Sequence, residues 1–491
     1  MLSILVAHSY FLRFDRKQQE RAKPYPPLAT LQVASMLRRS GHEVRVFDAM
    51  LAPGVEEYEQ LLREFQPQLV LLYEDSFNFL SKMCLERMRR ASCEMIGLAR
   101  RADARVLTVG SDASDAPEPY LHAGAEAVLM GEALPLLRLL LQRLDCDPKL
   151  PLAQLIHGQS GVAVLLDGKL TASRSPKPSS DTQRVDAPAW ELIDIERYRA
   201  VWQRAHGYFS LNMAASRGCS FRCNWCAKPI WGNKYLQRGP QEVAAEMIDL
   251  KQRFSPDHIW FADDIFGFKV DWIDRFAQAA RAAGGPIPFT IQTRADLISF
   301  AMAGALAEAG CTEAWLGAES GSQKVLNAMN KGITVEQIVT ARARLKAENI
   351  RVGFFIQIGY LGEQLDDILA TRDLIEQARP DDIGVSVSYP LPGTPFYEQV
   401  KAQLGSKTHW QESNDLEMMF DGTYSSEFYR SVRELLHDQV HAQQLQAAHR
   451  DHDYQRASQS LQRRWESLIE REPQYRRDSN NALDSGSALA V

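Results

Sequence analysis

The stretch "SRGCSFRCNWCAKP", residues 216–229, gathers three cysteines and decides how the second half of the chain is interpreted. Cys219, Cys223 and Cys226 stand four and three residues apart. Thiolates bind zinc or iron–sulfur clusters, and a closed structural zinc site normally takes four ligands. Three thiolates on a four-iron cluster would leave one iron free to bind a small molecule through its amine and carboxylate. A zinc site completed by His206 is the alternative.

The other cysteines show no comparable grouping. The chain has seven cysteines in all, an odd number that does not fit a disulfide framework. Cys84, Cys93, Cys146 and Cys311 are scattered along the sequence. Because buried free thiols commonly pack as small apolar groups, we expect these four to be inert.

Size and composition indicate a soluble protein with more than one domain. The chain has 491 residues, of which 45% are hydrophobic and 24% charged. Its net charge of -6 comes without a long basic run, which argues against a nucleic-acid partner. No apolar run approaches the roughly 20 residues of a membrane span, and the first residues lack the features of a signal peptide. We therefore expect a cytoplasmic protein without a transmembrane segment.

The first part of the chain alternates short apolar segments with helical patterns. Strands are predicted at 2–7, 43–48, 68–73, 105–109 and 127–130, and helices at 28–39, 56–65, 79–100 and 133–144. This alternation predicts a doubly wound parallel sheet over residues 1–150, which would bind a ligand at the carboxyl ends of its strands. Residues 151–195, with the polar stretch 171–188, are predicted to be a linker region.

A second alternation predicts a partial (β/α)6 barrel over residues 196–403. Its strands are expected near 209–215, 257–262, 287–292, 312–317, 352–358 and 383–388. Thr334 and Gln337 have the spacing of a capping box at the start of a helix over 335–347. Residues 404–470 are expected to be helical, with a stripe formed by Phe428, Val432, Leu435, Leu436 and Val440. Residues 471–491 are expected to form a disordered tail.

Polar residues follow the predicted barrel strands in turn. They are Asp263 and Asp264, Thr293 and Arg294, Glu319 and Ser320, Gln357 and Gly359, and Tyr389. Chemistry in such barrels sits at the carboxyl ends of the strands, so these residues would line one mouth. A role as a helix N-cap could explain Asp263 or Ser320 individually, but explains the whole set poorly.

The cysteine segment resembles the CxxxCxΦC signature of the radical S-adenosylmethionine superfamily, with Trp225 at the aromatic position. The resemblance implies that Cys219, Cys223 and Cys226 hold a [4Fe-4S] cluster. The open iron of that cluster would chelate S-adenosylmethionine (SAM), and an electron from the cluster would cleave SAM to a 5′-deoxyadenosyl radical. Trp225 would pack near the adenine, with plain core packing as the alternative.

Other stretches from about 200 to 400 are similar to motifs of the same superfamily. "FADDIFGF" at 261–268 corresponds to the motif that contacts the amino group of the cofactor, through Asp263 and Asp264, although the usual Gly-Gly-Glu is absent. "QTRADLI" at 292–298 and "WLGAESGSQKVLNAMNKG" at 315–332 imply that Arg294, Glu319 and Ser320 hold the carboxylate and ribose. "IQIGYLGE" at 356–363 places Gln357 beside the adenine, and "YPLPGTPFYE" at 389–398 matches the sixth-strand region.

The N-terminal part resembles the cobalamin-binding domain that precedes the barrel in one branch of this superfamily. Backbone at Tyr73–Asp75, Gly110–Ser111 and Gly131–Glu132 would then face the corrin. The Asp-x-His-x-x-Gly motif that supplies a lower cobalt ligand is absent, because no glycine follows three residues after His8. Cobalt would lack a histidine ligand, or the domain would be retained as a scaffold without cobalamin. His8 is interpreted as an ordinary strand-end histidine.

Within that branch, residues 409–437 look most like the end of the anaerobic magnesium-protoporphyrin monomethyl ester cyclase and its methylase relatives. The resemblance implies a radical enzyme that functionalises an unactivated carbon of a small molecule, by methyl transfer from cobalamin. Its electron donor would be a flavodoxin or ferredoxin. Cyclase-type oxidation of a tetrapyrrole-like substrate is an alternative, and a non-catalytic metal-binding or sensor protein is the alternative of another class. A methylthiotransferase is less favoured because its extra cysteine triad is not evident.

Overall fold

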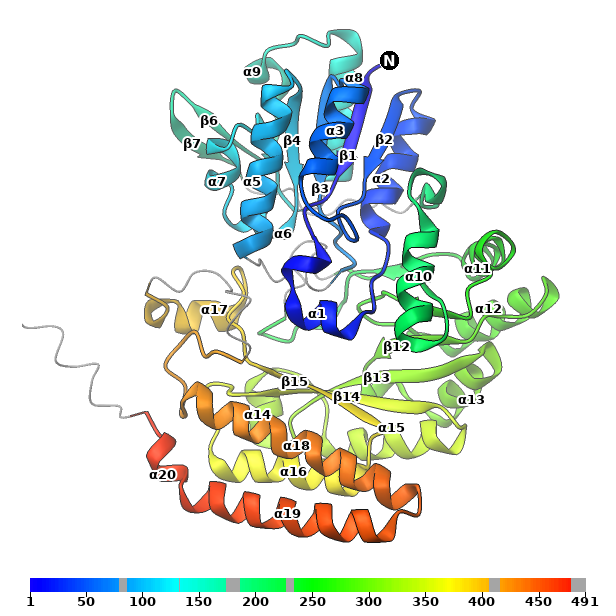
Figure 1. The fold of residues 1–491 in the computed structure, drawn as a ribbon, viewed down its shortest axis with the longest axis vertical. Helices are drawn as coiled ribbons and strands as arrows, with labels where there is room; N and C mark the ends of the chain where they lie inside the picture. The colour runs from blue at the N-terminus through cyan, green and yellow to red at the C-terminus, as the bar shows by residue number, and fades with distance from the viewer. Residues whose placement is uncertain (79–85, 132, 174–185, 227–233, 406–415, 478–491) are drawn as a thin grey trace, which may run out of the picture.

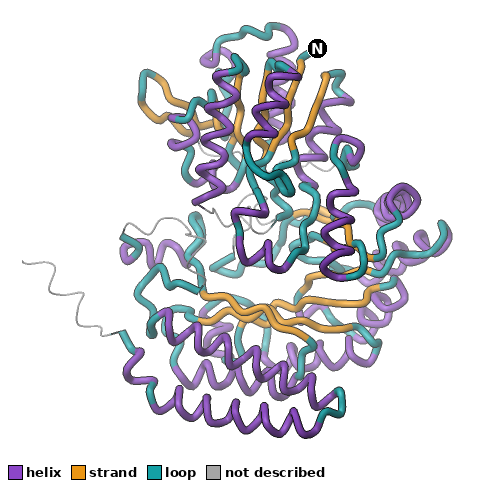
Figure 2. The backbone as a smooth tube through the Cα atoms, in the orientation of Figure 1, coloured by secondary structure: helices purple, strands orange, loops and turns teal. Residues whose placement is uncertain are grey.

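The computed structural model describes residues 1–78, 86–131, 133–173, 186–226, 234–405 and 416–477. An N-terminal sheet with its helices forms the upper part in Figure 1, and a second sheet lies across the middle with most of its helices beneath it. Loops that follow the strands of the N-terminal sheet lie between the two sheets (Figure 2). This arrangement turns the carboxyl edge of one sheet toward the other.

The N-terminal sheet has the strand order β2-β1-β3-β4-β5-β6-β7, and its first five strands are parallel. These are β1 (Ser3–Ala7), β2 (Glu43–Phe47), β3 (Leu69–Tyr73), β4 (Arg105–Val109) and β5 (Ala127–Leu129). The helices α2 (Leu28–Arg39) and α8 (Leu134–Cys146) cover one face, and α3 (Glu56–Phe65) and α5 (Glu86–Arg101) cover the other. The predicted doubly wound sheet is confirmed.

The order of the strands reverses between β1 and β3, because the chain moves from β1 to β2 on one side and then to β3 on the other. In open parallel sheets of this order, the crevice at the carboxyl end of the reversal point is the usual ligand site. Here the carboxyl ends of β1 and β3 point toward the second sheet (Figure 1).

The sheet extends past the predicted boundary at residue 150. Strands β6 (Val162–Leu166) and β7 (Lys169–Ala172) form an antiparallel hairpin that pairs with β5. Asp167 and Gly168 adopt φ values of 49° and 74° in its two-residue turn, as Asp-Gly does in tight hairpins. These residues therefore belong to the sheet and not to the predicted linker. Residues 174–185 of that linker lie outside the described residues.

The second sheet is the predicted partial barrel, with six parallel strands in chain order. These are β8 (Ser210–Met213), β11 (His258–Phe261), β12 (Phe289–Thr293), β13 (Cys311–Glu319), β14 (Arg351–Ile358) and β15 (Asp382–Val387). The intervening helices are α11 (Pro240–Phe254), α12 (Val270–Ala282), α13 (Phe300–Ala309), α14 (Gln323–Ala328), α15 (Val335–Ala347) and α16 (Leu365–Ala378). The capping box of Thr334 and Gln337 is present at the start of α15.

Beyond the barrel, α17 (Pro395–Val400) is followed by the long helices α18 (Ser426–Ala447) and α19 (Asp451–Glu470) and the short α20 (Glu472–Tyr475). The predicted apolar stripe of α18 is buried. Helix α20 and a bridge between Tyr424 and Arg476 show that residues 472–476 are structured, which corrects the predicted start of the tail. Residues 406–415 and 478–491 lie outside the described residues.

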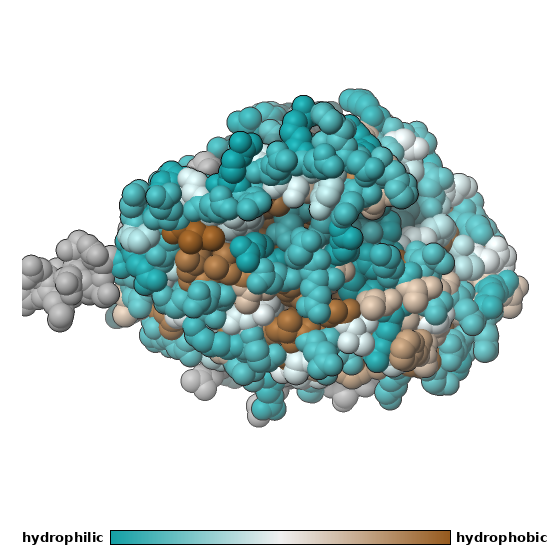
Figure 3. Space-filling view, turned by 90° about the horizontal axis from the view of Figure 1, so that it is seen from below, coloured by the Kyte–Doolittle hydropathy of each residue, from teal (hydrophilic) through white to brown (hydrophobic). Residues whose placement is uncertain are grey.

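The face seen from below in Figure 3 is mainly hydrophilic, with separate small hydrophobic patches. Within the described ranges, no helix combines the length and the hydropathy that crossing a membrane requires.

A proline-rich strap, residues 24–26, joins the two sheets between α1 (Arg16–Arg21) and α2. Trp202, on α10 (Ile195–His206), donates from its indole nitrogen to the carbonyl of Pro24 at 2.7 Å. Asn212 on β8 donates to the carbonyl of Pro26 at 2.9 Å. Tyr25 lies between these contacts, with its hydroxyl 3.1 Å from Ser210 Oγ. The strap therefore packs an N-terminal segment against the first barrel strand.

Candidate functional site

The three cysteines lie in the loop that follows β8 and the two-residue strand β9 (Ser216–Arg217). Cys219 is buried, and Cys223 and Cys226 are half-buried. The start of the loop is fixed by Asp263, whose carboxylate accepts from the backbone nitrogen of Ala215 at 3.0 Å and from the hydroxyl of Ser216. Strand β9 also pairs with β10 (Leu236–Gln237). The loop therefore begins from a rigid base at the carboxyl end of the barrel.

Asn224 anchors the middle of the cysteine loop. Its backbone nitrogen donates to the carbonyl of Met329 at 3.0 Å, and its amide side chain donates to the carbonyl of Ala328 at 2.7 Å. The hydroxyl of Tyr360 donates to Asn224 Oδ1 at 2.9 Å. Because these partners lie at the end of α14 and after β14, the loop is held from two neighbouring barrel units.

The zinc alternative can be compared with the surroundings of His206. Among the residues that the structure describes, no three His, Cys, Asp or Glu side chains converge closely enough to hold one metal ion. A four-iron cluster binds each thiolate through a different iron, so its ligands need not converge on one point. His206, the proposed fourth zinc ligand, instead lies 3.1 Å from the carbonyls of Arg21 and Ala22. The geometry does not support the zinc alternative.

Arg294, just after β12, lies directly against the cysteine loop. Its guanidinium is 3.7 Å from the sulfur of Cys223 and 3.7 Å from the ring centroid of Phe221. Its other nitrogens bind both oxygens of Asp296 and the carbonyl of Lys331. The side chain is almost fully buried, so the positive charge is fixed in place beside the cysteine loop.

Lys331 is a residue of this site that the sequence reasoning missed. Its ammonium nitrogen contacts Glu319 Oε1 at 2.6 Å and lies 6.0 Å from the ring centroid of Trp225. Burial lowers the pKa of Lys331, but the charges of Glu319 and Cys223 outweigh burial and raise it. The available sequence signal was that Lys331 directly precedes Gly332 in the stretch 315–332, which was already compared with the fourth-strand motif. Its burial could not be read from the sequence.

Asp263 and Asp264 occupy the end of β11 as predicted. Asp263 is fully buried, and burial raises its pKa to about 7 against the opposing hydrogen bonds from Ser216 and Ala215. Its carboxylate is therefore engaged with the cysteine loop itself, while Asp264 beside it is half-buried. A direct cofactor contact of either aspartate stays a prediction.

Ser320 and Gln357 also lie at strand ends, in different surroundings. The Ser320 hydroxyl is 3.2 Å from that of Thr371 on α16 and accepts from the backbone nitrogen of Ser322, so it stabilises the turn after β13. Gln357 is only 4% exposed, yet its Oε1 has no hydrogen-bond partner among the residues that the structure describes. Of the two, Gln357 has an acceptor available for a ligand.

The residues predicted to face a corrin lie together at the carboxyl edge of the N-terminal sheet. Tyr73 ends β3, Gly110 and Ser111 begin the short α6 (Ser111–Asp115), and Gly131 follows β5. The backbone nitrogen of Gly131 donates to Ser114 at 3.1 Å. A Cβ atom at Gly110 would lie 2.9 Å from Cγ of Glu74, so a glycine is needed there. Glu132 lies outside the described residues.

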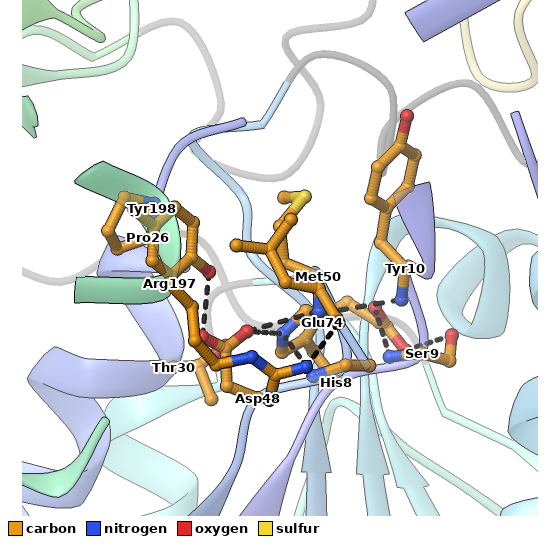
Figure 4. Close-up of polar contacts among 12 residues, drawn as sticks. His8, Ser9, Tyr10, Pro26, Thr30, Asp48, Met50, Glu74, Arg197 and Tyr198 are labelled. Carbon is orange, nitrogen blue, oxygen red and sulfur yellow. Dashed lines mark hydrogen bonds and ion pairs between the residues drawn. The ribbon is translucent and has the colours of Figure 1, made fainter. Parts of the chain in front are cut away.

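The buried His8 pairs with the half-buried Asp48 at the same edge (Figure 4). His8 Nε2 lies 3.0 Å from Asp48 Oδ1 and 3.1 Å from the backbone nitrogen of Ala49. Burial lowers the pKa of His8, but the hydrogen bond and charge of Asp48 outweigh burial and raise it. Tyr198 on α10 donates its hydroxyl to Asp48 Oδ2 at 2.7 Å. These contacts fit the interpretation of His8 as a structural strand-end residue.

Glu74 closes the edge on the other side of His8 (Figure 4). It accepts from the hydroxyl of Ser9 at 2.6 Å and from the backbone nitrogen of the same residue. Burial raises the pKa of Glu74. Two carboxylates therefore flank the histidine at the reversal point of the sheet.

The two candidate sites are neighbours in space. Arg217, two residues before Cys219, contacts Gln32 on α2 and lies 5.4 Å from the ring centroid of Phe77, in the loop after β3. The cysteine loop therefore touches the loops at the carboxyl edge of the N-terminal sheet. A ligand at either edge would face the other.

With this geometry established, comparison with known proteins identifies the class. Residues 213–375 match the family described as the Radical SAM superfamily, and this part of the chain is a radical SAM domain. The domain implies a [4Fe-4S] cluster and SAM as cofactors.

Most of the chain is similar to known proteins. It is 23% identical over 381 residues to an uncharacterized methyltransferase of Pyrococcus horikoshii, covering 76% of this chain and 78% of that protein. The structure of the cobalamin-dependent S-adenosylmethionine radical enzyme OxsB, with aqua-cobalamin and SAM bound, aligns with a TM-score of 0.63 at 19% identity. That alignment covers 81% of this chain but 55% of OxsB, and it shows a shared fold.

The predicted branch is also represented among the relatives. The anaerobic magnesium-protoporphyrin IX monomethyl ester cyclase of Rubrivivax gelatinosus is 23% identical over 241 residues. The match covers 48% of this chain and 42% of the cyclase, so the chain spans less than half of that protein.

Proposed function

We propose that this protein is a cobalamin-dependent radical SAM enzyme that transfers a methyl group to an unactivated carbon of a small molecule. The observation that carries the proposal is the contact between Arg217, beside the cysteine loop, and Phe77 at the carboxyl edge of the N-terminal sheet. A cluster at one edge and a corrin at the other would then share one space between the domains. The similarity to the methyltransferase of Pyrococcus horikoshii supports methyl transfer.

The bound cofactors would supply the radical and the methyl group, and the chain would position them and exclude water. Cys219, Cys223 and Cys226 would hold the cluster. The guanidinium of Arg294 suits the carboxylate of SAM, and the carboxylate of Glu319 suits the ribose hydroxyls. Lys331 would fix Glu319 in place through its ion pair.

The remaining predicted residues would complete the two cofactor sites. Trp225 would pack against the adenine, with Asp263, Asp264, Ser320 and Gln357 around the mouth. Tyr73, Gly110, Ser111 and Gly131 would present their backbone to the corrin. Because the cysteine loop is held by Asp263 and Asn224, the cluster site would be largely formed before the cofactors bind. An electron donor such as a flavodoxin or ferredoxin would reduce the cluster.

Anaerobic reconstitution with iron, sulfide and hydroxocobalamin tests the proposal. We expect about four iron atoms and about four sulfides per chain, together with about one cobalt. Reduction in the presence of SAM should then yield 5′-deoxyadenosine. Cys226→Ser should lose the cluster and this product, whereas Cys146→Ser, at an exposed cysteine, should keep both.

Cobalt content separates the two parts of the proposal. Cobalt near zero, with normal formation of 5′-deoxyadenosine, would reject methyl transfer from cobalamin and leave the radical chemistry standing. Absence of both iron and 5′-deoxyadenosine would reject the enzyme altogether and favour a metal-binding or sensor protein. The similarity to the Rubrivivax cyclase supports oxidation of the cyclase type as a second candidate function. In that case the mass difference between product and substrate would not equal one methylene group.

A further inference from the structure

Helix α1 presents two basic side chains to a pocket that it shares with the C-terminal helices. Lys17 and Arg21 line this pocket, and their spacing of four residues places them on one face of α1. Asp15 caps the start of α1 by accepting from the backbone nitrogen of Gln18 at 3.1 Å. At the other end of α1, His206 Nε2 lies 3.1 Å from the carbonyl of Arg21. The two basic side chains therefore start from a backbone that is fixed at both ends.

Helix α18 presents two rows of charged side chains to the same pocket. One row is basic, Arg433 and His437, and the neighbouring row is acidic, Glu434 and Asp438. Arg464 on α19 binds the carboxylate of Asp438 and lies 3.6 Å from that of Glu434. The acidic row is therefore already paired with a cation of α19, and the basic row lies beside it.

The pocket has the size of a small-molecule site. Its volume is about 590 Å³, within the roughly 300–1,000 Å³ that such sites occupy. In Figure 1, α1 lies between the two sheets and α18 runs below it. Val385 of β15 also lines the pocket, and it precedes Tyr389 at the predicted mouth by about 13 Å of strand. The pocket is therefore separate from the predicted SAM site.

Charges from both helices act on His437. Burial lowers the pKa of His437, and Asp382 at the start of β15 opposes this effect. The charges of Arg433, Arg21 and Lys17 lower the pKa further. The cations of α1 and α18 are therefore close enough to disfavour another positive charge between them. An anion at this position would offset that repulsion.

We propose that this pocket binds a small molecule through its phosphate groups, which bridge α1 and α18. Guanidinium groups bind phosphate through paired hydrogen bonds, and Arg21 and Arg433 supply one guanidinium from each helix. Because α1 belongs to the N-terminal part of the chain and α18 follows the barrel, the bound phosphate joins the two parts. The site goes beyond the proposed function, since it uses none of the residues assigned to the cluster, SAM or cobalamin.

Isothermal titration calorimetry of the full chain with sodium diphosphate tests the site without cluster, cobalamin or reductant. Diphosphate should bind at least about tenfold more tightly than sulfate, the control anion. Arg21→Gln and Arg433→Gln should each weaken diphosphate binding by about tenfold. Arg430→Gln removes the same charge one turn earlier on α18, outside the pocket, and should leave binding unchanged.

The same titrations can overturn the proposal. Equal affinity for diphosphate and sulfate, or an equal loss in all three variants, would show only a diffuse attraction of anions. A loss in Arg433→Gln without a loss in Arg21→Gln would show that the ligand does not bridge the two helices.

His437 gives a second readout, which locates the ligand. A bound anion favours the protonated imidazole, so saturating diphosphate should raise the pKa of His437. NMR titration of the histidine side chains measures this pKa, and the signal that disappears in His437→Gln identifies the residue. An unchanged pKa of His437 would place the ligand elsewhere and overturn the proposal.

Sedimentation with phosphatidylcholine vesicles that carry phosphatidic acid separates a soluble ligand from a lipid headgroup. We expect the protein to stay in the supernatant. Sedimentation that Arg21→Gln abolishes would assign the pocket to a lipid headgroup and overturn the small-molecule ligand. Formation of 5′-deoxyadenosine remains the separate test of the proposed function, so the two can fail independently.

Discussion

Lys331 is paired with Glu319 by a contact of 2.6 Å, and the two side chains are 6% and 5% exposed. Glu319 also has a φ of 62°, a conformation that residues other than glycine rarely adopt. The lysine therefore stabilises a buried carboxylate on a strained backbone at the end of β13.

Replacing Lys331 by methionine should strongly destabilise the protein. The Glu319 carboxylate would be left buried without its cation, an effect of about 3–5 kcal/mol on the free energy of unfolding. Guanidinium denaturation followed by circular dichroism measures it. Lys401→Met, at an exposed pair with Glu398, should change little. The double variant Lys331→Met/Glu319→Gln should recover most of the loss, and a double variant as unstable as the single one would contradict this account.

Glu363 should make stability depend on pH. Burial raises its pKa to about 8, although the backbone nitrogen of Gly359 donates to it at 2.6 Å. Between about pH 4.5 and 8 the unfolded chain loses this proton before the folded chain does, so the contribution of Glu363 to stability falls as pH rises.

The variant Glu363→Gln mimics the protonated side chain and cannot ionise. Its stability should therefore lack the pH dependence that Glu363 causes. Between pH 5.5 and 7.5 the stability of the variant should rise relative to the wild type by up to about 3 kcal/mol. Urea denaturation at both pH values measures the difference. Glu398→Gln, at an exposed glutamate, should show no such trend. A constant difference between Glu363→Gln and the wild type would show that the glutamate is ionised throughout.

Arg294 should matter for SAM binding more than for cluster binding. Its planar guanidinium contacts Asp296, the carbonyl of Lys331 and the sulfur of Cys223 at once. A lysine cannot reproduce such a fork. We expect Arg294→Lys to weaken SAM binding by about tenfold, or about 1.4 kcal/mol, in equilibrium dialysis. Iron content should match the wild type, and a parallel loss of iron would show that Arg294 mainly holds the cysteine loop.

Tyr198→Phe should loosen the contact between the domains. The variant removes the hydroxyl that donates to Asp48 at 2.7 Å across the domain boundary. Loss of this half-buried hydrogen bond to an aspartate should destabilise the protein by about 1.5 kcal/mol. Thermal unfolding and amide hydrogen exchange on α10 measure it. Tyr397→Phe on α17 is the control, and faster exchange in both variants would contradict a specific domain contact.

Much of the architecture could be predicted because local patterns and tertiary structure agree. The barrel strands follow contiguous apolar segments, and the capping box at Thr334 and Gln337 marks the start of α15 as observed. The hairpin of β6 and β7 was missed although Asp167-Gly168 is a strong turn signal, because its second strand has exposed side chains and resembles a linker. The structured residues after 471 were missed because the bridge between Tyr424 and Arg476 forms only in the folded chain.

The candidate site was predicted where spacing carries the information. The cysteine motif places three thiols in one loop, and polar residues at strand ends locate Arg294 and Glu319. The pairing of Lys331 with Glu319 depends on how α14 returns to the barrel, which no local pattern encodes. The contact of Tyr198 with Asp48 joins residues 150 positions apart, so it became visible only in the structure.

The strap of residues 24–26 changes how the chain can be divided for study. The polypeptide leaves the N-terminal unit, places the Pro24 and Pro26 carbonyls on Trp202 and Asn212, and then returns to complete that unit. An expression fragment that starts at residue 196 would lose both acceptors and uncover the indole of Trp202. Such a truncation should aggregate, whereas co-expression with a fragment that carries residues 1–195 should restore solubility.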